Sequence, residues 1–407
     1  MAKLKSSARN LGDVRELNLS MIIKLMQKLK ICSRADLAKS TGLRQSTITN
    51  IVNEMIDCGL VSETGNIEGA KGRRSIGITF NSHLFNVISI RLTRNSFIVG
   101  RFDISGKENS IITHPIASGE QVDETLSKIE SCVDTLIKMS QQRIIGIGIA
   151  VPGPLLNKED RILLMTGSSG WENVNFREYF NDRFKMPVYV EHDANAGALA
   201  EWWFSNENFE LGTFVYVAAG QGIGAGVMTD GKIMHGVSGI AGEIGHMCIN
   251  FDGPRCQCGN FGCLENYCSV MALMKAINQG IDDSILTILK KGANFEQVVE
   301  AVHKNDVFAM TTTECIAGYL GIGLANIVNL YNPGTIIIGD ELSRLDNFLN
   351  HVQQTIQSHV LPEISDNLSV RLTSFKHDPA LIGAVALVVD KVLKKPTDIL
   401  QKSQFTY

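Results

Sequence analysis

Long apolar runs are missing from this chain of 407 residues, and no apolar segment of the secretory type stands near its start. A membrane-spanning helix needs roughly 20 consecutive apolar residues, and no stretch approaches that length. The first ten residues, MAKLKSSARN, are polar and basic, unlike a signal peptide. Internal repeats and low-complexity segments are also missing. We therefore expect a cytoplasmic protein that has no membrane partner.

A disulfide framework is not expected either. The chain holds nine cysteines, an odd number, without an export signal, and thiols in such proteins usually stay reduced. Hydrophobic residues are 44% of the chain and charged residues 20%, which is typical of a folded globular protein. A chain of this length is expected to form two or three domains.

The net charge of −4 is unevenly distributed along the chain. Residues 1–82 hold 13 Lys and Arg against 7 Asp and Glu, whereas the remaining residues hold 25 against 35. A basic head on an acidic body favours a head that binds nucleic acid. Basic ends of proteins are often simply exposed to solvent, so the charge alone does not establish nucleic-acid binding without a sequence motif that supports it.

The start of the chain carries the pattern of a helix-turn-helix. Residues 16–30 place their apolar side chains on one helical stripe. In the next segment, Ser33 and Asp36 form an N-cap pattern, and Gly42 ends a short helix. A third helix is expected within residues 44–60, with polar side chains gathered near its N-terminus. This order of helices and turn is that of a helix-turn-helix.

The exposed face of the third helix carries the candidate DNA-reading residues, which are Arg44, Gln45, Ser46, Thr47, Thr49 and Asn50. Amides read base edges in the major groove, and arginine contacts bases or phosphates. Two strands after this helix are expected to form a wing whose tip carries Lys71, Arg73 and Arg74, and such basic tips suit an electronegative minor groove. We predict a winged helix-turn-helix DNA-binding domain over residues 1–82, with a generic three-helix interaction module as the alternative.

Four side chains of the metal-ligand type lie within eighteen residues of glycine-rich sequence: His246, Cys256, Cys258 and Cys263. Thiolates and imidazole suit a tetrahedral zinc ion, and glycines let a short loop aim several ligands at one point. Four protein ligands leave no open position for a catalytic water, so we predict a structural zinc. The alternative is a set of ordinary buried thiols and a core histidine. Glu243 and Glu265 flank the cluster and are candidates for binding a ligand beside the metal.

Behind the head, strands alternate with helices in two groups, which predicts an α/β body of two lobes. The expected strands include FNVISIRL (85–92), RIIGIGIAVPGPLL (143–156), PVYVEH (187–192), FVYVAAGQGIGAGVMTDGKIMHG (214–236) and NPGTIIIGDELS (332–343). The expected long helices are 122–140, 314–330 and 379–393. We assign residues 83–194 with 380–407 to the first lobe. Residues 195–379 form the second lobe, with the zinc loop and a dimerisation surface.

Two further features are ambiguous on pattern alone. Asp193 stands between an expected strand and an expected helix, where it either caps the helix or serves a site. The glycines at positions 220, 222, 224 and 226 belong either to a phosphate-facing hairpin or to a tight β-turn. Neither feature decides the function alone.

Taken together, these segments resemble the ROK family of repressors, open reading frames and sugar kinases. The resemblance covers nearly the whole chain and includes VPGP (151–154), EHDANAGALAE (191–201), GQGIGAG (220–226), GEIGH (242–246), CQCGNFGCLE (256–265) and IIIGDELS (336–343). It implies an RNase H-like, actin-like body of two lobes, preceded in longer members by a winged helix-turn-helix. It also implies a sugar between the lobes, at Gly153, Ser168, His192, Asp193, Glu243, His246 and Glu265.

The sequence departs from the kinases of this family where they hold the nucleotide. Their acid and Gly-Gly-Thr turn are replaced here by RLTRN at residues 91–95. A cation cannot hold Mg²⁺, and side chains fill the space where backbone amides would hold phosphate. Gln221 lies where the kinases have a threonine, and Asp340 lies where they have a glycine. In the expected sugar pocket, His192 replaces the usual asparagine. These changes argue against kinase activity.

We therefore expect a sugar-responsive transcriptional repressor of carbohydrate-utilisation genes that is not an enzyme. Its expected partners are double-stranded operator DNA, a small sugar effector and further copies of the chain, as a homodimer or a dimer of dimers. A sugar kinase that carries a DNA-binding head is the alternative. A regulator that answers to a protein partner is a third reading, and titration with sugars separates it from the first.

Overall fold

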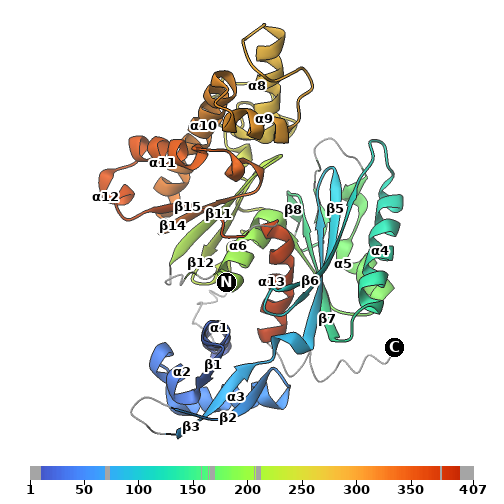
Figure 1. The fold of residues 1–407 in the computed structure, drawn as a ribbon, viewed down its shortest axis with the longest axis vertical. Coiled ribbons are helices and arrows are strands. Elements are labelled where there is room, and N and C mark those ends of the chain that lie inside the picture. Colours follow the sequence, from blue (N-terminus) through green and yellow to red (C-terminus); the bar gives the residue numbers. More distant parts are fainter. Residues whose placement is uncertain are drawn as a thin grey trace, which may run out of the picture.

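The computed structural model describes residues 11–68, 74–156, 158–163, 165, 170–205, 207, 212–375 and 378–394. These residues form a small head and a body with two five-stranded sheets, and two packed helices lie between those sheets (Figure 1). Among the predicted site residues, Ser168, Lys71 and Arg73 lie outside the described residues, as does the side chain of Arg74.

The head has the predicted order of helices. Its elements are α1 (Leu11–Leu29), β1 (Ile31–Ser33), α2 (Arg34–Thr41), α3 (Gln45–Asp57), β2 (Val61–Glu68) and β3 (Arg74–Phe80). A capping box confirms the predicted start of α2, because Ser33 and Asp36 each accept a hydrogen bond from the other's backbone N–H. Gly42 ends the helix with a φ of +70°, which glycine adopts without strain. The wing has three strands instead of two, since β1 pairs with β3.

The first sheet of the body has the strand order β10-β7-β4-β5-β6. Its strands are β4 (Phe85–Leu92), β5 (Ser96–Asp103), β6 (Glu108–Pro115), β7 (Arg143–Val151) and β10 (Val188–His192), with a separate two-stranded ribbon of β8 (Leu155–Leu156) and β9 (Arg161–Ile162). Strands β4, β7 and β10 run parallel. Every residue of β4 is buried. Helices α4 (Val122–Lys138) and α5 (Phe176–Phe184) cover one face of this sheet, and α13 (Pro379–Lys394) covers the other.

The second sheet has the strand order β13-β12-β11-β14-β15. Its strands are β11 (Thr213–Ala219), β12 (Ile223–Thr229), β13 (Lys232–Ile233), β14 (Thr335–Gly339) and β15 (Ser369–Leu372). Its helices are α7 (Glu265–Cys268), α8 (Val270–Asp282), α9 (Phe295–His303), α10 (Val307–Tyr331), α11 (Phe348–His359) and α12 (Pro362–Ser365). Side chains from β11, β12 and β14 share a core with α8 to α11.

Helix α6 (Asp193–Phe204) and helix α13 form the pair between the two sheets (Figure 1). Close approach requires glycine here, because a Cβ on Gly383 would lie 1.8 Å from the Ala196 carbonyl oxygen. A Cβ on Gly148 of β7 would likewise lie 1.9 Å from the Ala384 carbonyl oxygen. One continuous core runs from the head through α6 and α13. The predicted lobe boundary at residue 194 falls at the start of α6.

Helix α10 corrects one sequence-based expectation. It begins at Val307, before the predicted Glu314, because the Asp306 side chain caps it by accepting a hydrogen bond from the Ala309 N–H. Over 25 residues it is long and apolar enough to cross a membrane, although no such stretch was expected. Half of its apolar window is buried inside the body, as for a core helix.

Candidate functional site

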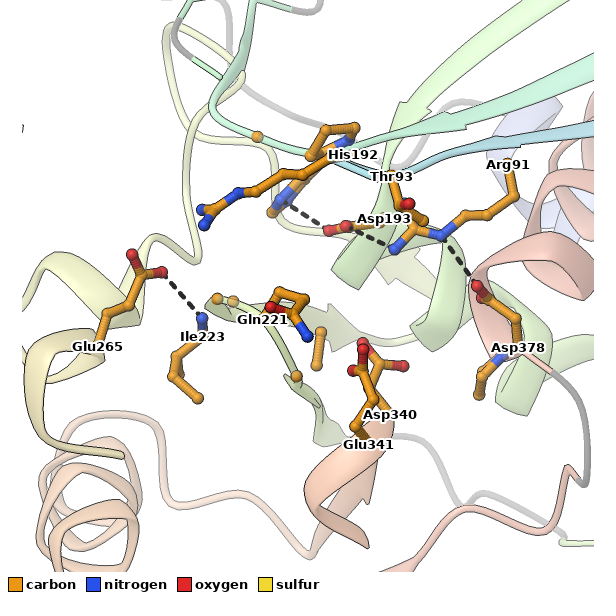
Figure 2. A pocket seen from close by; sticks show the side chains of 18 of the residues that line it. Arg91, Thr93, His192, Asp193, Gln221, Ile223, Glu265, Asp340, Glu341 and Asp378 are labelled. Carbon is orange, nitrogen blue, oxygen red and sulfur yellow. Dashed lines mark hydrogen bonds and ion pairs between the residues drawn. The ribbon is translucent and has the colours of Figure 1, made fainter. Parts of the chain in front are cut away.

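A cavity of about 470 Å³ lies where strands of both sheets end (Figure 2). The carboxyl ends of β4, β7 and β10 supply residues such as Arg91, Gly153 and His192. The second sheet supplies residues 220–222, between β11 and β12, and Asp340, directly after β14. Ligands of α/β proteins bind at this end of parallel strands. The cavity is therefore the candidate ligand site.

The structure brings six of the seven predicted sugar-binding residues to this cavity, namely Gly153, His192, Asp193, Glu243, His246 and Glu265. Glu265 opens α7, and its Oε2 accepts a hydrogen bond of 3.0 Å from the Ile223 N–H. A Cβ on Gly153 would lie 2.4 Å from His192 Nε2 and 3.1 Å from Glu243 Oε1, so glycine lets these two side chains meet. Their binding of a sugar stays a prediction.

Asp193 is held by two cations. Its Oδ2 lies 2.9 Å from Arg91 Nη2, and its Oδ1 lies 3.0 Å from His192 Nε2. Burial alone would raise the pKa of Asp193, but the two cations outweigh burial and hold that pKa well below its ordinary value. Burial alone would lower the pKa of His192, but neighbouring carboxylates, led by Asp193, raise it to about 9. At neutral pH the pair is therefore a carboxylate beside an imidazolium.

Arg91 joins the starts of two helices. Besides pairing with Asp193 at the start of α6, its Nε donates to Oδ2 of Asp378, directly before α13, at 3.2 Å. Its Nη1 donates to the Leu92 carbonyl oxygen at 2.8 Å. The Arg91 side chain is buried, its two aspartate partners are half-buried, and Figure 2 shows the three together. A paired guanidinium thus lies where the family resemblance would place an acid that holds Mg²⁺.

Further carboxyl groups lie beside this arginine. Burial and the charge of Asp378 raise the pKa of Asp340 well above its ordinary value, and the Tyr216 hydroxyl donates to its Oδ1 at 3.2 Å. Glu341 lies against Gly220, where a Cβ would come within 2.1 Å of Glu341 Oε2. Asp340 and Glu341 thus line this half of the cavity together with Arg344.

The four predicted metal ligands meet at one point, with all ligand atoms within 4.8 Å of one another. Cys256 Sγ lies 3.8 Å from His246 Nδ1, and Cys258 Sγ lies 3.7 Å from Cys263 Sγ. A tetrahedron with bonds of ~2.3 Å to sulfur has edges of about 3.8 Å. The cluster therefore has the donor set and the dimensions of a closed site with four ligands, and it can hold a metal ion.

His246 belongs to both the cluster and the cavity. Its Nδ1 faces the Cys256 thiol, while the residue also lines the cavity. A metal bound through Nδ1 would leave the proton on Nε2, which makes that nitrogen a hydrogen-bond donor. The metal site and the ligand site are thus joined by one imidazole ring.

The predicted DNA-reading residues lie at the start of α3, on the outer side of the head. The exposed ones are Arg44, Gln45, Ser46 and Asn50, and the half-buried ones are Thr47 and Thr49. The opposite face of the helix is buried through Ile48, Ile51, Val52 and Met55. Figure 1 shows the head at the end of the molecule away from the second sheet. DNA binding by these residues stays a prediction.

Two residues of the cleft were missed as site residues. Asp378 stands before Pro379 at the start of α13, and acid followed by proline is a helix-start signal, so its position could have been found. Arg94, on the turn between β4 and β5, donates at 3.0 Å to the sulfur of Met271 on α8. No sequence pattern marks that contact across the cleft.

The whole chain is similar to known regulators. It is 30% identical to the xylose repressor of Caldicellulosiruptor bescii, over 94% of this chain and 98% of that protein. It is also 30% identical to the DNA-binding transcriptional dual regulator NagC of Escherichia coli, over 93% of this chain and 94% of that protein. The crystal structure of a ROK family transcriptional regulator, a homologue of the E. coli MLC protein, has a TM-score of 0.79 at 27% identity and covers 95% of this chain and 99% of its own. Residues 89–391 match the model of the ROK family, and this chain therefore belongs to the ROK family.

Proposed function

We propose that this chain is a sugar-responsive transcriptional repressor of carbohydrate-utilisation genes. One observation carries the proposal. A winged helix-turn-helix head is joined to a cleft in which Arg91 forms an ion pair with the carboxylate of Asp193. The names of the relatives that match over nearly the full length, a xylose repressor and a transcriptional regulator, support the same function. The alternative is a sugar kinase that carries a DNA-binding head.

The charges in the cleft argue against the kinase. A general base works best with a pKa near the working pH, whereas two cations hold the pKa of Asp193 well below its ordinary value. Mg²⁺ binds to oxygen ligands, and the guanidinium of Arg91 offers none. We infer that the chain has no enzymatic activity.

An uncharged sugar is the effector that the side chains favour. The carboxylates of Asp193, Glu243 and Glu265 can accept charge-assisted hydrogen bonds from sugar hydroxyls. The cavity also holds arginines, but Arg91 is already paired with Asp193 and Asp378. Arg344 is paired with Glu296. The name of the xylose repressor makes D-xylose the first sugar to test.

The metal in this proposal is a structural zinc ion. Three thiolates and one imidazole suit zinc and fill its tetrahedron, so the ion would brace the loop and leave no position for catalysis. Such a brace would fix His246 between Glu243 and Glu265 before the sugar binds.

We propose a cytoplasmic homodimer, or a dimer of dimers, that binds an operator with two-fold symmetry. Dimeric helix-turn-helix proteins place their reading helices in successive major grooves, so the half-sites would lie about 10 bp or a multiple of that apart. In the head, α3 would read bases and the wing would contact the minor groove.

Operator binding with and without sugar tests the function. The full chain is used to select its preferred duplex from random DNA, and the affinity is then measured with D-xylose, D-glucose and N-acetylglucosamine in turn. One sugar is expected to weaken binding by about 5- to 150-fold. A sugar at 100 times its dissociation constant should also add about 2.7 kcal/mol to the stability. Formation of sugar phosphate from ATP above about 1 s⁻¹ would instead establish the kinase, and sequence preference with no sugar response would favour a protein effector.

A further inference from the structure

The head is docked on the body through α1, and a lysine side chain lies at this contact. Lys24 of α1 places its Nζ 3.2 Å from the ring centroid of Trp202 and 5.6 Å from that of Trp203. Both tryptophans lie near the end of α6. Burial lowers the pKa of Lys24, although the charge of Asp390 on α13 opposes that shift. In its protonated form, a desolvated amino group over an indole ring makes one of the stronger cation–π contacts.

Near Lys24, two polar groups are not satisfied. Trp203 Nε1 and Gln27 Nε2 are both buried without an acceptor among the residues that the structure describes. Gln27 follows Lys24 by three residues on α1, so the two side chains share a helix face. Buried donors without acceptors oppose docking. The contact of Lys24 with the tryptophans therefore favours docking of the head, whereas the unpaired donors oppose it. A small displacement can change which of the two is larger.

The helices that Lys24 faces begin at the cleft. Asp193 is the first residue of α6, and Asp378 directly precedes α13. Arg91 binds both carboxylates, at 2.9 and 3.2 Å. The 12 residues of α6 span about 18 Å at 1.5 Å per residue. One end of this helix pair thus lies in the candidate sugar site, and a later part of it lies against the head.

The helix pair can transmit a displacement because it is tightly packed. Gly383 of α13 lies directly on the backbone of Ala196 in α6, as the close approach above shows. The same continuous core contains residues of α1, α6 and α13. Densely packed interiors transmit strain instead of absorbing it.

We propose that Lys24 is the positioning residue through which the cleft controls the head. Sugar hydroxyls that bind Asp193 compete with Arg91 for its carboxylate and displace the packed pair of α6 and α13 relative to α1. The displacement at Trp202 then weakens the docking of Lys24 and changes the orientation of α3. This inference rests on the proposed function, because it assumes a sugar in the cleft and an operator on the head.

The first experiment compares Lys24→Met with Lys24→Arg in the full chain, and Lys28→Met, an exposed lysine of the same helix, is the control. Operator affinity is measured with and without D-xylose, or with the sugar to which wild type responds. Sugar affinity is measured without DNA by calorimetry. For Lys24→Met, the ratio of operator affinities is expected to fall close to one, while sugar affinity is retained or rises because no docking contact opposes sugar binding. Lys24→Arg and Lys28→Met should keep the wild-type ratio.

A merely structural role for Lys24 predicts a different result. Lys24→Met would then lower the stability of the protein but leave the response ratio as in wild type. That outcome would overturn the proposal. A wild-type chain that responds to no sugar would contradict the proposed function instead.

The second experiment needs no sugar. Arg91→Ala releases Asp193 and Asp378 from each other, so hydrogen exchange in α1 is expected to become faster. The control is Arg177→Ala, which breaks an ion pair of 2.8 Å with Asp160 outside the cleft and should leave α1 unchanged. Exchange in β11 and β14 serves as the internal reference for an intact fold. If hydrogen exchange in α1 is unchanged in Arg91→Ala, the pair of α6 and α13 does not transmit a displacement from the cleft to the head.

Discussion

At the scale of single residues, Asp193 connects the two halves of the cleft. It pairs with Arg91 on the side where the family resemblance places the nucleotide of kinases, and with His192 on the side predicted for the sugar. Its charge is fully engaged before any sugar arrives. A sugar hydroxyl that binds this carboxylate must therefore share it with both cations. The resulting change in the two ion pairs would displace α6, which begins at Asp193.

The first prediction concerns the residues that would accept sugar hydroxyls. Glu243→Ala is expected to give a repressor that binds operator as wild type does but ignores sugar. Asp193→Asn is also expected to ignore sugar, but with weaker operator binding, because Arg91 loses its charged partner. Both lose a charged acceptor within the cavity, and neither lies in the head. The measurement is operator affinity with and without saturating sugar, with Glu178→Ala on the surface of α5 as the control. Variants that respond like wild type would show that the cleft is not the sensor.

The second prediction uses the raised pKa of His192. In the folded chain this pKa is about 9, against an ordinary value of 6.5. The charged imidazolium therefore stabilises the fold fully below about pH 6.5, and this stabilisation is lost as the pH rises through about 9. We expect the free energy of unfolding of wild type to fall more steeply over this range than that of His192→Gln. Urea unfolding at several pH values measures it, and parallel curves would contradict the assignment.

At the scale of elements, the cysteine loop and the start of α7 position the two glutamates of the cleft. Glu265 follows Cys263 closely, and Glu243 closely precedes His246. The two arms of the loop are joined through their backbones by an isolated antiparallel β-bridge at Cys248 and Cys263, whose thiols are free. The positions of these carboxylates therefore depend on how the loop is held together.

The third prediction follows from this dependence. The isolated protein should contain one zinc per chain, and Cys258→Ser should lower both the stability of the body and the sugar affinity. Metal analysis of reduced protein and sugar calorimetry measure the two effects, with Cys315→Ser, an exposed cysteine of α10, as the control. Reduced wild type that carries no zinc would contradict the prediction.

The fourth prediction separates reading from positioning in the head. Gln45→Ala or Asn50→Ala should cost roughly 1–3 kcal/mol on the preferred operator and relax base choice, because these exposed amides would read base edges. Replacing Arg73 and Arg74 should weaken binding to all DNA and reduce its salt dependence. Affinities for operator and random duplex at several salt concentrations test both. Equal losses on both duplexes from the helix variants would show that α3 is not the reading helix.

Local patterns were predictable from sequence, and contacts between distant segments were not. The capping box of Ser33 and Asp36 lies within four residues, so its signal is complete in the sequence. Strand β1 has only three residues and exists because β3 offers it an edge, which no local pattern contains. Lys24 and Trp202 are joined only by the way α1 folds onto α6. The cleft residues were found mainly through the family resemblance, because their types alone do not define a common site.

At the scale of the whole molecule, the two cores differ in what they include. One core joins the head, α6, α13 and one face of the second sheet, whereas the other face of that sheet shares a separate core with helices α8 to α11. Asp193 belongs to the first of these units, and Glu243 and Glu265 come from segments around the second sheet. A sugar held by both groups would favour a closed cleft over an open one. In a dimer, closure would change how the two heads face their half-sites.

The last prediction is that operator and sugar weaken each other equally. If sugar lowers operator affinity by a factor of about 5 to 150, which is about 1–3 kcal/mol of coupling, saturating operator must lower sugar affinity by the same factor. The reason is that the free, singly bound and doubly bound states form one thermodynamic cycle, which has a single coupling free energy. Calorimetric titration of sugar into free protein and into the protein–operator complex measures it, at one salt concentration and one protein concentration. The contrary outcome is that operator lowers sugar affinity by a smaller factor than sugar lowers operator affinity. A third equilibrium, such as dissociation of the dimer, would then account for part of the coupling free energy. Direct coupling through α6 and α13 would then be insufficient.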